Sequence, residues 1–157
     1  MSARYFAAAD LGASSGRVIL GALAGGRFEL SQTARFANGP VDQADGIHTD
    51  APTLFEEVRT GLAAAIQASG GALESVGGVH AGVVDAPGVD YARVDAAGAL
   101  LENPFHYRHE RTQGVPELVF TGLPAAQLYA TAGLQVMPFN TIFQLVAAAQ
   151  LPGWERT

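Results

Sequence analysis

The first third of the chain alternates between apolar runs and short polar turns. An apolar run over 4–10 leads into a segment of small residues, 11–16, that is typical of a tight turn. A second apolar run, 17–23, ends at Gly25-Gly26, a hairpin signal, and 27–36 then alternates apolar with polar residues. The pattern predicts three consecutive antiparallel strands within residues 4–36.

The pattern changes twice further along. Between Asn38 and Pro52 the chain is rich in Gly, Pro, Asp and Asn, which predicts a surface loop. From Pro52 apolar residues recur every fourth position up to Gly70-Gly71, which predicts a helix that starts at a proline and ends at a glycine pair. We expect its apolar stripe to lie in the core; the stripe is Leu54, Val58, Leu62 and Ile66.

The remaining pattern is mixed. Residues 76–94 are strand-like but glycine-rich, and 95–98 offer a hairpin turn before Leu100. Helices are expected over 115–131, with a break around 122–124, and over 141–151. Strands, a crossover helix and more strands predict an α/β fold of the ribonuclease-H-like or actin-like kind, with a mixed sheet whose first three strands are antiparallel. Periodicity alone does not separate it from other α/β folds.

Composition narrows the class of protein. With 157 residues, 48% of them hydrophobic, the chain can build one compact domain with a sizeable core. Its net charge is −6 and it has no run of basic residues that could bind nucleic acid or an anionic membrane. Neither is therefore expected as a partner. It has no cysteine, which excludes disulfides and thiolate zinc sites. Asp10 interrupts any signal-peptide pattern and no apolar run approaches ~20 residues, so we expect a cytoplasmic protein.

The strongest candidate for chemistry is the segment Asp10-Leu11-Gly12-Ala13-Ser14-Ser15-Gly16-Arg17. Its two glycines permit positive φ and let the N–H groups of 12–16, Ala13 included, approach a phosphate closely. The Ser14 and Ser15 hydroxyls can donate to phosphate oxygens, and Arg17 can neutralise their charge. Asp10 could hold Mg²⁺ through water. The same residues would also suit a plain polar hairpin turn.

Five segments in order resemble the N-terminal half of the FGGY carbohydrate kinases, a family with the actin-like ATPase fold. They are the phosphate motif at 10–17 and the segments 35–40, 88–91, 103–112 and 138–145. Together they extend over nearly the whole chain. Agreement at one segment could arise by chance, whereas agreement at five in the right order favours common ancestry.

The resemblance implies an ATP-dependent kinase that uses Mg²⁺ to phosphorylate a primary hydroxyl of a sugar, a ketose such as L-rhamnulose. It implies that Gly12, Ala13, Ser14, Ser15, Gly16 and Arg17 grip the γ-phosphate, that Asp10 serves the metal, and that Asp85 and Gly88 face the sugar. Residues 1–157 would be the N-terminal domain, and a second domain would be absent from this chain. The catalytic base, an aspartate, would lie beyond Thr157, so the chain alone is expected to be inactive. Sugar and ATP are its expected partners, and no oligomeric state is implied.

The departures from the family leave alternatives open. Asp85-Ala86-Pro87-Gly88-Val89-Asp90 stands where the branch acting on L-rhamnulose has Asp-Thr-Trp-Gly-Val-Asp, so a hydroxyl and an indole are lost and the sugar is open. Segment 77–82 looks like additional material in a strand, and Pro87 would remove a donor from that strand. One alternative is a catalytically inactive remnant that keeps a weak phosphate site. A remoter one is an acetate-kinase-like or chaperone-like relative, against which 35–40 and 103–112 count.

Two further pairs of residues are weaker candidates. His106 and His109 have the spacing of a metal-ligand pair, but with no third ligand and no firm helix they are more simply loop residues. Asp85 and Asp90 could be paired acid and base carboxylates. Their five-residue separation in a strand would place them on opposite faces, which disfavours the pair.

Overall fold

The computed structural model describes residues 3–71, 73–75 and 89–154. By its internal contacts the chain divides into two compact units. The first comprises 1–40 with 50–88, and the second comprises 41–49 with 89–157. That both units belong to one kinase domain stays a prediction.

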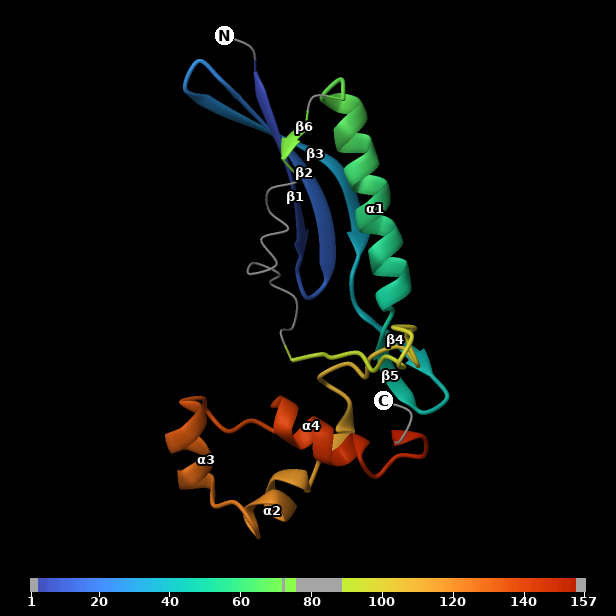
Figure 1. The fold of residues 1–157 in the computed structure, drawn as a ribbon, viewed down its shortest axis with the longest axis vertical. Helices are drawn as coiled ribbons and strands as arrows, with labels where there is room; N and C mark the ends of the chain where they lie inside the picture. The colour runs from blue at the N-terminus through green and yellow to red at the C-terminus, as the bar shows by residue number, and fades with distance from the viewer. Residues whose placement is uncertain (1–2, 72, 76–88, 155–157) are drawn as a thin grey trace. The chain divides into compact units, whose positions relative to one another are not determined.

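The first unit is built on a four-stranded mixed sheet (Figure 1). Strands β1 (Arg4–Leu11), β2 (Ser15–Ala24) and β3 (Arg27–Ala37) are antiparallel neighbours, which confirms the three predicted strands. Strand β6 (Leu73–Ser75) pairs parallel to β1, so the sheet order is β3-β2-β1-β6. The predicted α/β class with a mixed sheet is therefore present.

Helix α1 (Ala51–Ala68) lies along one face of this sheet (Figure 1). It begins where the Asp50 side chain accepts the Thr53 N–H, and it ends before Gly70 and Gly71, which both have positive φ. The predicted helix is thus confirmed at both ends.

The prediction that the large apolar stripe of α1 lies in the core is confirmed only in part, since Leu62 packs against the buried cluster that contains Ala65. The fully buried positions are Gly61 and Ala65, whereas Leu54, Val58 and Leu62 are half-buried and Ile66 is 45% exposed. A Cβ on Gly61 would come within 2.5 Å of a Val18 methyl, so the helix backbone sits directly on β2 and β3. Small residues permit this close approach and leave the larger side chains at the margins of the contact.

The predicted surface loop 38–52 is also wrong, because it contains a two-stranded sheet of β4 (Pro40–Gln43) and β5 (Gly46–Thr49). Of the turn residues recognised in the sequence, Asp45 lies in the turn between the two strands and Gly46 begins β5. Strand β5 is held in place by residues distant in the sequence. Thr49 N–H donates to Pro104 O at 2.8 Å, and His106 N–H donates to Ile47 O at 3.1 Å. Such long-range pairing leaves no local signal in the sequence.

The rest of the second unit consists of short helices around a small core. They are η1 (Glu110–Thr112), α2 (Val115–Phe120), α3 (Ala125–Ala132) and α4 (Thr141–Ala148), and the predicted break at 122–124 is confirmed. Val115, Phe143 and Ala147 form the buried cluster. A bridge between Val94 and Leu100 confirms the turn at 95–98. Of the strand predicted over 76–94, residues 76–88 lie outside the described residues and 89–93 form no strand.

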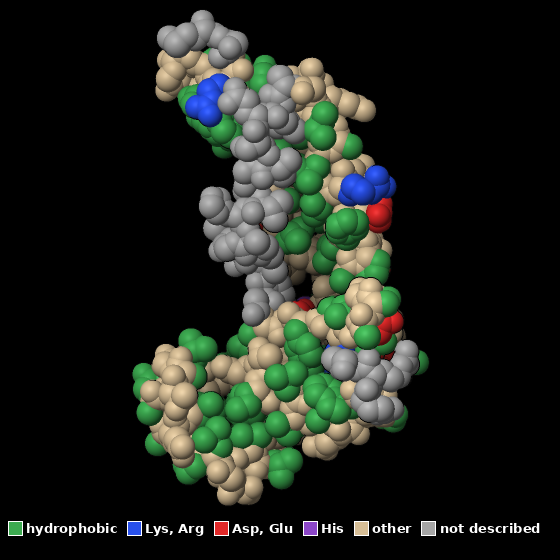
Figure 2. Space-filling view, viewed as in Figure 1, with side chains coloured by type: hydrophobic (Ala, Val, Ile, Leu, Met, Phe, Trp, Pro, Cys, Tyr) green, Lys and Arg blue, Asp and Glu red, His purple; other side chains and the backbone are tan. Residues whose placement is uncertain are grey.

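Much apolar surface stays exposed on this second unit, as the green side chains in Figure 2 show. The large exposed apolar residues here are Val94, Leu100, Leu118, Tyr129, Leu134 and Leu145. None of the helices over the described ranges is both long and apolar enough to cross a membrane.

Candidate phosphate site and buried polar network

The predicted phosphate motif occupies the end of the β1–β2 hairpin. The strands pair Leu11 with Gly16, and the intervening turn closes when Gly12 N–H donates to Ser15 O at 3.1 Å. Ala13 and Ser14 are exposed at its tip, and Ser15 is half-buried at the start of β2. The serines therefore lie neither in a helix nor under a core, as the sequence predicted. The cleft expected beside them stays a prediction.

Asn38, at the end of β3, holds this turn from one side. Its side-chain Nδ2 donates to Gly12 O at 2.7 Å and its backbone N–H donates to Ser14 O at 3.1 Å. The carbonyls of Gly12 and Ser14 are thereby occupied. Within the described part of the chain, the N–H groups of Ala13 and Ser14 donate to no protein acceptor. Two adjacent backbone donors at an exposed turn can bind an anion.

Asp10 and Arg17 face each other across the strand pair next to the turn. Arg17 Nε donates to Asp10 Oδ2 at 2.8 Å, and the side chains are 50% and 38% exposed, respectively. An exposed pair of this kind contributes only about 0–1 kcal/mol, so a bound ion could rearrange it at little cost. The predicted metal residue and the predicted phosphate cation are thus in direct contact.

The two glycines of the motif are closely packed. Neither Gly12 nor Gly16 has a positive φ, so neither uses the conformation that glycine permits, and the close approach to a phosphate stays a prediction. A Cβ on Gly16 would come within 2.1 Å of the Phe36 ring, and one on Gly12 would lie 3.2 Å from Ser15 O. Close packing explains why these positions lack a side chain.

In the second unit, the half-buried Asp90 and the buried His106 lie near enough to influence each other's pKa. Thr49 Oγ1 donates to Asp90 Oδ2 at 2.6 Å, yet desolvation outweighs this bond and the nearby His106 and raises the pKa of Asp90. Burial likewise lowers the pKa of His106, and Arg108 adds to the effect while Asp90 opposes it. His106 Nδ1 accepts the Arg108 N–H at 3.2 Å, which requires that nitrogen to be unprotonated.

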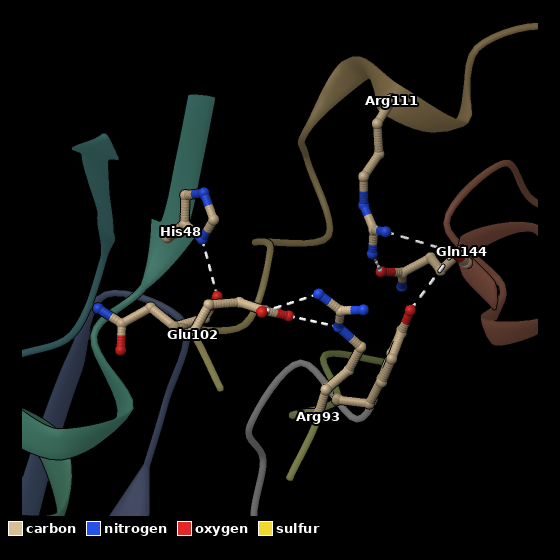
Figure 3. Close-up of polar contacts among 7 residues, drawn as sticks. His48, Arg93, Glu102, Arg111 and Gln144 are labelled. Carbon is tan, nitrogen blue, oxygen red and sulfur yellow. Dashed lines mark hydrogen bonds and ion pairs between the residues drawn. The ribbon is translucent and has the colours of Figure 1, made fainter. Parts of the chain in front are cut away.

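A buried polar network of this unit centres on Gln144 of α4 (Figure 3). Its side chain is 1% exposed. Its Nε2 donates to Val89 O and to Phe139 O, both at 2.9 Å, and its Oε1 accepts from Arg111 Nη2 at 2.7 Å. One buried amide thus connects the segment at 89, the segment at 139 and the η1 turn.

A second set of contacts holds the neighbouring segments together (Figure 3). Arg93 binds Glu102 through two parallel hydrogen bonds of 2.5 and 2.8 Å. His48, 1% exposed, contacts Asn103 O through Nδ1 at 2.8 Å and Asp45 Oδ1 through Nε2 at 2.9 Å. These contacts explain how segments 93–103 and β5 are fixed.

The remaining predicted residues divide into two groups. Asp85 and Gly88, predicted to face a sugar, lie outside the described residues. His106 and His109 form no metal site: His109 Nε2 contacts Asp45 O and its Nδ1 accepts the Arg111 N–H. Throughout 3–71, 73–75 and 89–154, no three potential ligands of the His, Cys, Asp or Glu type come together.

Sequence reasoning missed Asn38, His48 and Gln144. Asn38 and Gln144 lie inside segments that carry the family resemblance, at 35–40 and 138–145, so their position in those segments was an available signal. His48 lay in a stretch interpreted as a loop. Nothing local in that stretch indicates a buried ring.

Known proteins similar to this chain are sugar kinases. No protein-family model matches it. It is 35% identical over 140 residues to the rhamnulokinase of Bacteroides thetaiotaomicron. The matched residues make up 89% of this chain and 27% of that protein. It is 38% identical over 153 residues to the rhamnulokinase of an Enterobacter species, covering 96% and 30%. The chain therefore spans under a third of the length of these relatives.

Solved structures agree with this likeness. A gluconate kinase from Lactobacillus acidophilus superimposes with a TM-score of 0.72 at 14% identity, over 95% of this chain and 29% of that one. A xylulose kinase from the same organism gives 0.64 at 13% identity, over 94% and 28%. The actin-like fold and the resemblance to carbohydrate kinases are confirmed.

Proposed function

We propose, from the homology of this chain to rhamnulokinases of the FGGY carbohydrate kinase family, that it is the N-terminal, phosphate-binding domain of an ATP-dependent sugar kinase. The observation that carries the proposal is the β1–β2 turn, where two backbone N–H groups that find no acceptor among the described residues lie beside Asp10 and Arg17. The proposed substrate is a ketose such as L-rhamnulose, phosphorylated on a primary hydroxyl in the cytoplasm. Residues 1–157 supply one of the two domains that enclose the substrates.

The turn is suited to the phosphate end of ATP. Ala13 and Ser14 offer N–H groups, and the hydroxyls of Ser14 and Ser15 can turn toward the same anion. Arg17 keeps Nε on Asp10 while its terminal nitrogens, which have no acceptor among the described residues, are available to the phosphate. Phosphoryl transfer depends mainly on positioning and charge neutralisation, which these groups provide.

Asp10 suits a magnesium site as a single, half-exposed carboxylate. Mg²⁺ prefers oxygen ligands and retains several waters, so one carboxylate beside bound phosphates is a normal ligand set. The metal would neutralise phosphate charge when bound. The carboxylate of Asp10 would orient its water, and Arg17 would hold that carboxylate in place.

The sugar is assigned to Asp85 and Gly88, in the segment that departs from the family branch. Because Ala86 and Pro87 offer neither a hydroxyl nor an indole, another ketose could replace L-rhamnulose. The alternative is an inactive phosphate-binding remnant of the same fold, and this same departure favours it.

The test is a chimera in which this chain replaces the matching segment of the Bacteroides thetaiotaomicron rhamnulokinase. Purified chimera is assayed for ADP release with Mg²⁺, ATP and a panel of ketoses. We expect saturable phosphorylation of at least one ketose. A folded chimera that binds pyrophosphate but turns over no ketose would support the remnant instead, and one that binds neither would refute both.

The chain by itself should bind nucleotide weakly, since only phosphate and metal contacts have candidate residues here. We expect a millimolar or weaker Kd for ATP, about −4 kcal/mol or less favourable, by calorimetry. L-rhamnulose should not be phosphorylated above background. Micromolar affinity or saturable turnover by residues 1–157 would contradict this half-site account.

A further inference from the structure

Gln144 has the contacts of a residue that fixes a neighbouring backbone. We propose that Gln144, oriented by Arg111, is a positioning residue for the sugar side of the kinase, because its amide holds the carbonyl of Val89, directly after the predicted sugar residue Gly88. The inference rests on the proposed function. Gln144 was not predicted from the sequence as a site residue, and we propose no direct contact between Gln144 and the substrate.

The chemistry of the contacts fixes the orientation of the amide. Val89 O and Phe139 O are carbonyls and can only accept, so Nε2 must face them. The Arg111 guanidinium can only donate, so Oε1 must face it. A flipped amide would lose all three hydrogen bonds at a side chain that is 1% exposed.

Arg111 is itself held firmly. Its guanidinium carbon lies 4.4 Å from the centre of the Phe105 ring and 5.9 Å from that of Tyr91. Its Nη1 adds a long contact of 3.3 Å to the backbone carbonyl of Gln144. Arg111, packed against the rings of Phe105 and Tyr91, therefore holds the Gln144 amide in place. The amide in turn holds the backbone at Val89.

The position of Val89 matters because the next residue is also anchored. Asp90 accepts a 2.6 Å hydrogen bond from Thr49, so residues 89 and 90 are held from two directions. Losing the Gln144 bond releases one of the two anchors directly after the predicted sugar residue Gly88. The expected consequence is weaker sugar binding with ATP binding unchanged.

The experiment uses the chimera defined above, with Gln144→Leu, Gln144→Glu and Arg111→Lys as variants. The matched control is Phe143→Leu, the neighbouring buried residue of α4, which packs in the apolar cluster and holds no polar network. Assays are run well below each variant's melting temperature. Sugar and ATP constants are measured separately.

We expect Gln144→Leu to raise the sugar KM about tenfold or more with the ATP KM unchanged, as the loss of three buried hydrogen bonds implies. Gln144→Glu keeps the Arg111 contact but presents oxygen to Val89 O, so it should match Gln144→Leu. Arg111→Lys keeps one donor and should be intermediate. Phe143→Leu should lower the melting temperature and leave the sugar KM alone.

Equal sugar KM values in Gln144→Glu and Phe143→Leu would overturn the inference, because Gln144 would then act only on stability. If Gln144→Leu fails to fold, Gln144→Glu and Arg111→Lys decide the matter by the same comparison. An unmodified chimera that folds but phosphorylates no ketose refutes the proposed function itself, and the inference falls with it. Failure of the inference alone is recognised by an active unmodified chimera.

Discussion

Replacing Gly16 by alanine tests why the phosphate motif contains this glycine. The added Cβ would lie 2.1, 2.4 and 2.9 Å from three ring carbons of Phe36. Phe36 is itself buried, so the ring has little room to swing away. Overpacking of this kind costs about 1–3 kcal/mol of unfolding free energy. We expect Gly16→Ala to destabilise the first unit by about 2 kcal/mol.

The assay is native-state hydrogen exchange of β2 amides, because Trp154 lies in the second unit and does not report on the first. Gly39→Ala is the control, since its Cβ would meet nothing within 4 Å. In a Phe36→Leu background the ring is absent, and the cost of Gly16→Ala should fall to within about 0.5 kcal/mol of zero. An equal cost in both backgrounds would refute the packing explanation and return the glycine to a backbone or ligand role.

Three further outcomes are expected. In the chimera, Arg17→Ala should raise the activation barrier by about 2–4 kcal/mol, which lowers kcat and leaves the sugar KM unchanged. A raised sugar KM with a normal kcat would reassign Arg17 to sugar binding. Asn38→Ala should destabilise the first unit by about 1 kcal/mol in the same exchange assay, and no change would show that the Gly12 carbonyl is equally well solvated. Burial lowers the pKa of His106, so the unfolded chain takes up this proton first and stability should fall as the pH drops below 6.5. Urea unfolding followed by Trp154 fluorescence should show this loss reduced in His106→Gln, and an unchanged pH profile would contradict it.

The hydrophobic pattern predicted those elements whose structure depends on residues close together in the sequence. The three strands, α1 and the break before α3 follow from hydrophobic period and turn residues, and all are present. The β4–β5 sheet was missed because its order depends on hydrogen bonds to residues 104–106, more than fifty positions away. The depth of burial along α1 was misjudged, since a four-residue apolar period does not reveal that Gly61 packs against Val18 while the larger side chains stay half-buried.

The candidate site was likewise predicted only where its residues are adjacent in the sequence. The turn from Asp10 to Arg17 is continuous in sequence, so its residue types could be interpreted directly. The ion pair of Asp10 with Arg17 follows from strand register, which fixes residues that a linear motif lists separately. The network of Gln144 does not follow from local pattern, because two of its partners, Val89 and Arg111, come from distant segments, although Phe139 is only five positions away.

The central claim is that the β1–β2 turn binds the phosphates of ATP, and an NMR titration tests it most directly. The full chain, labelled with ¹⁵N, is titrated with Mg²⁺ and ATP into the range of about 10 mM, above the expected Kd. The account predicts saturating shifts of the Ala13 and Ser14 amides and of the Arg17 side chain, with α2 and α3 unaffected. Unchanged Ala13 and Ser14 resonances, or saturating shifts confined to the second unit, would contradict it.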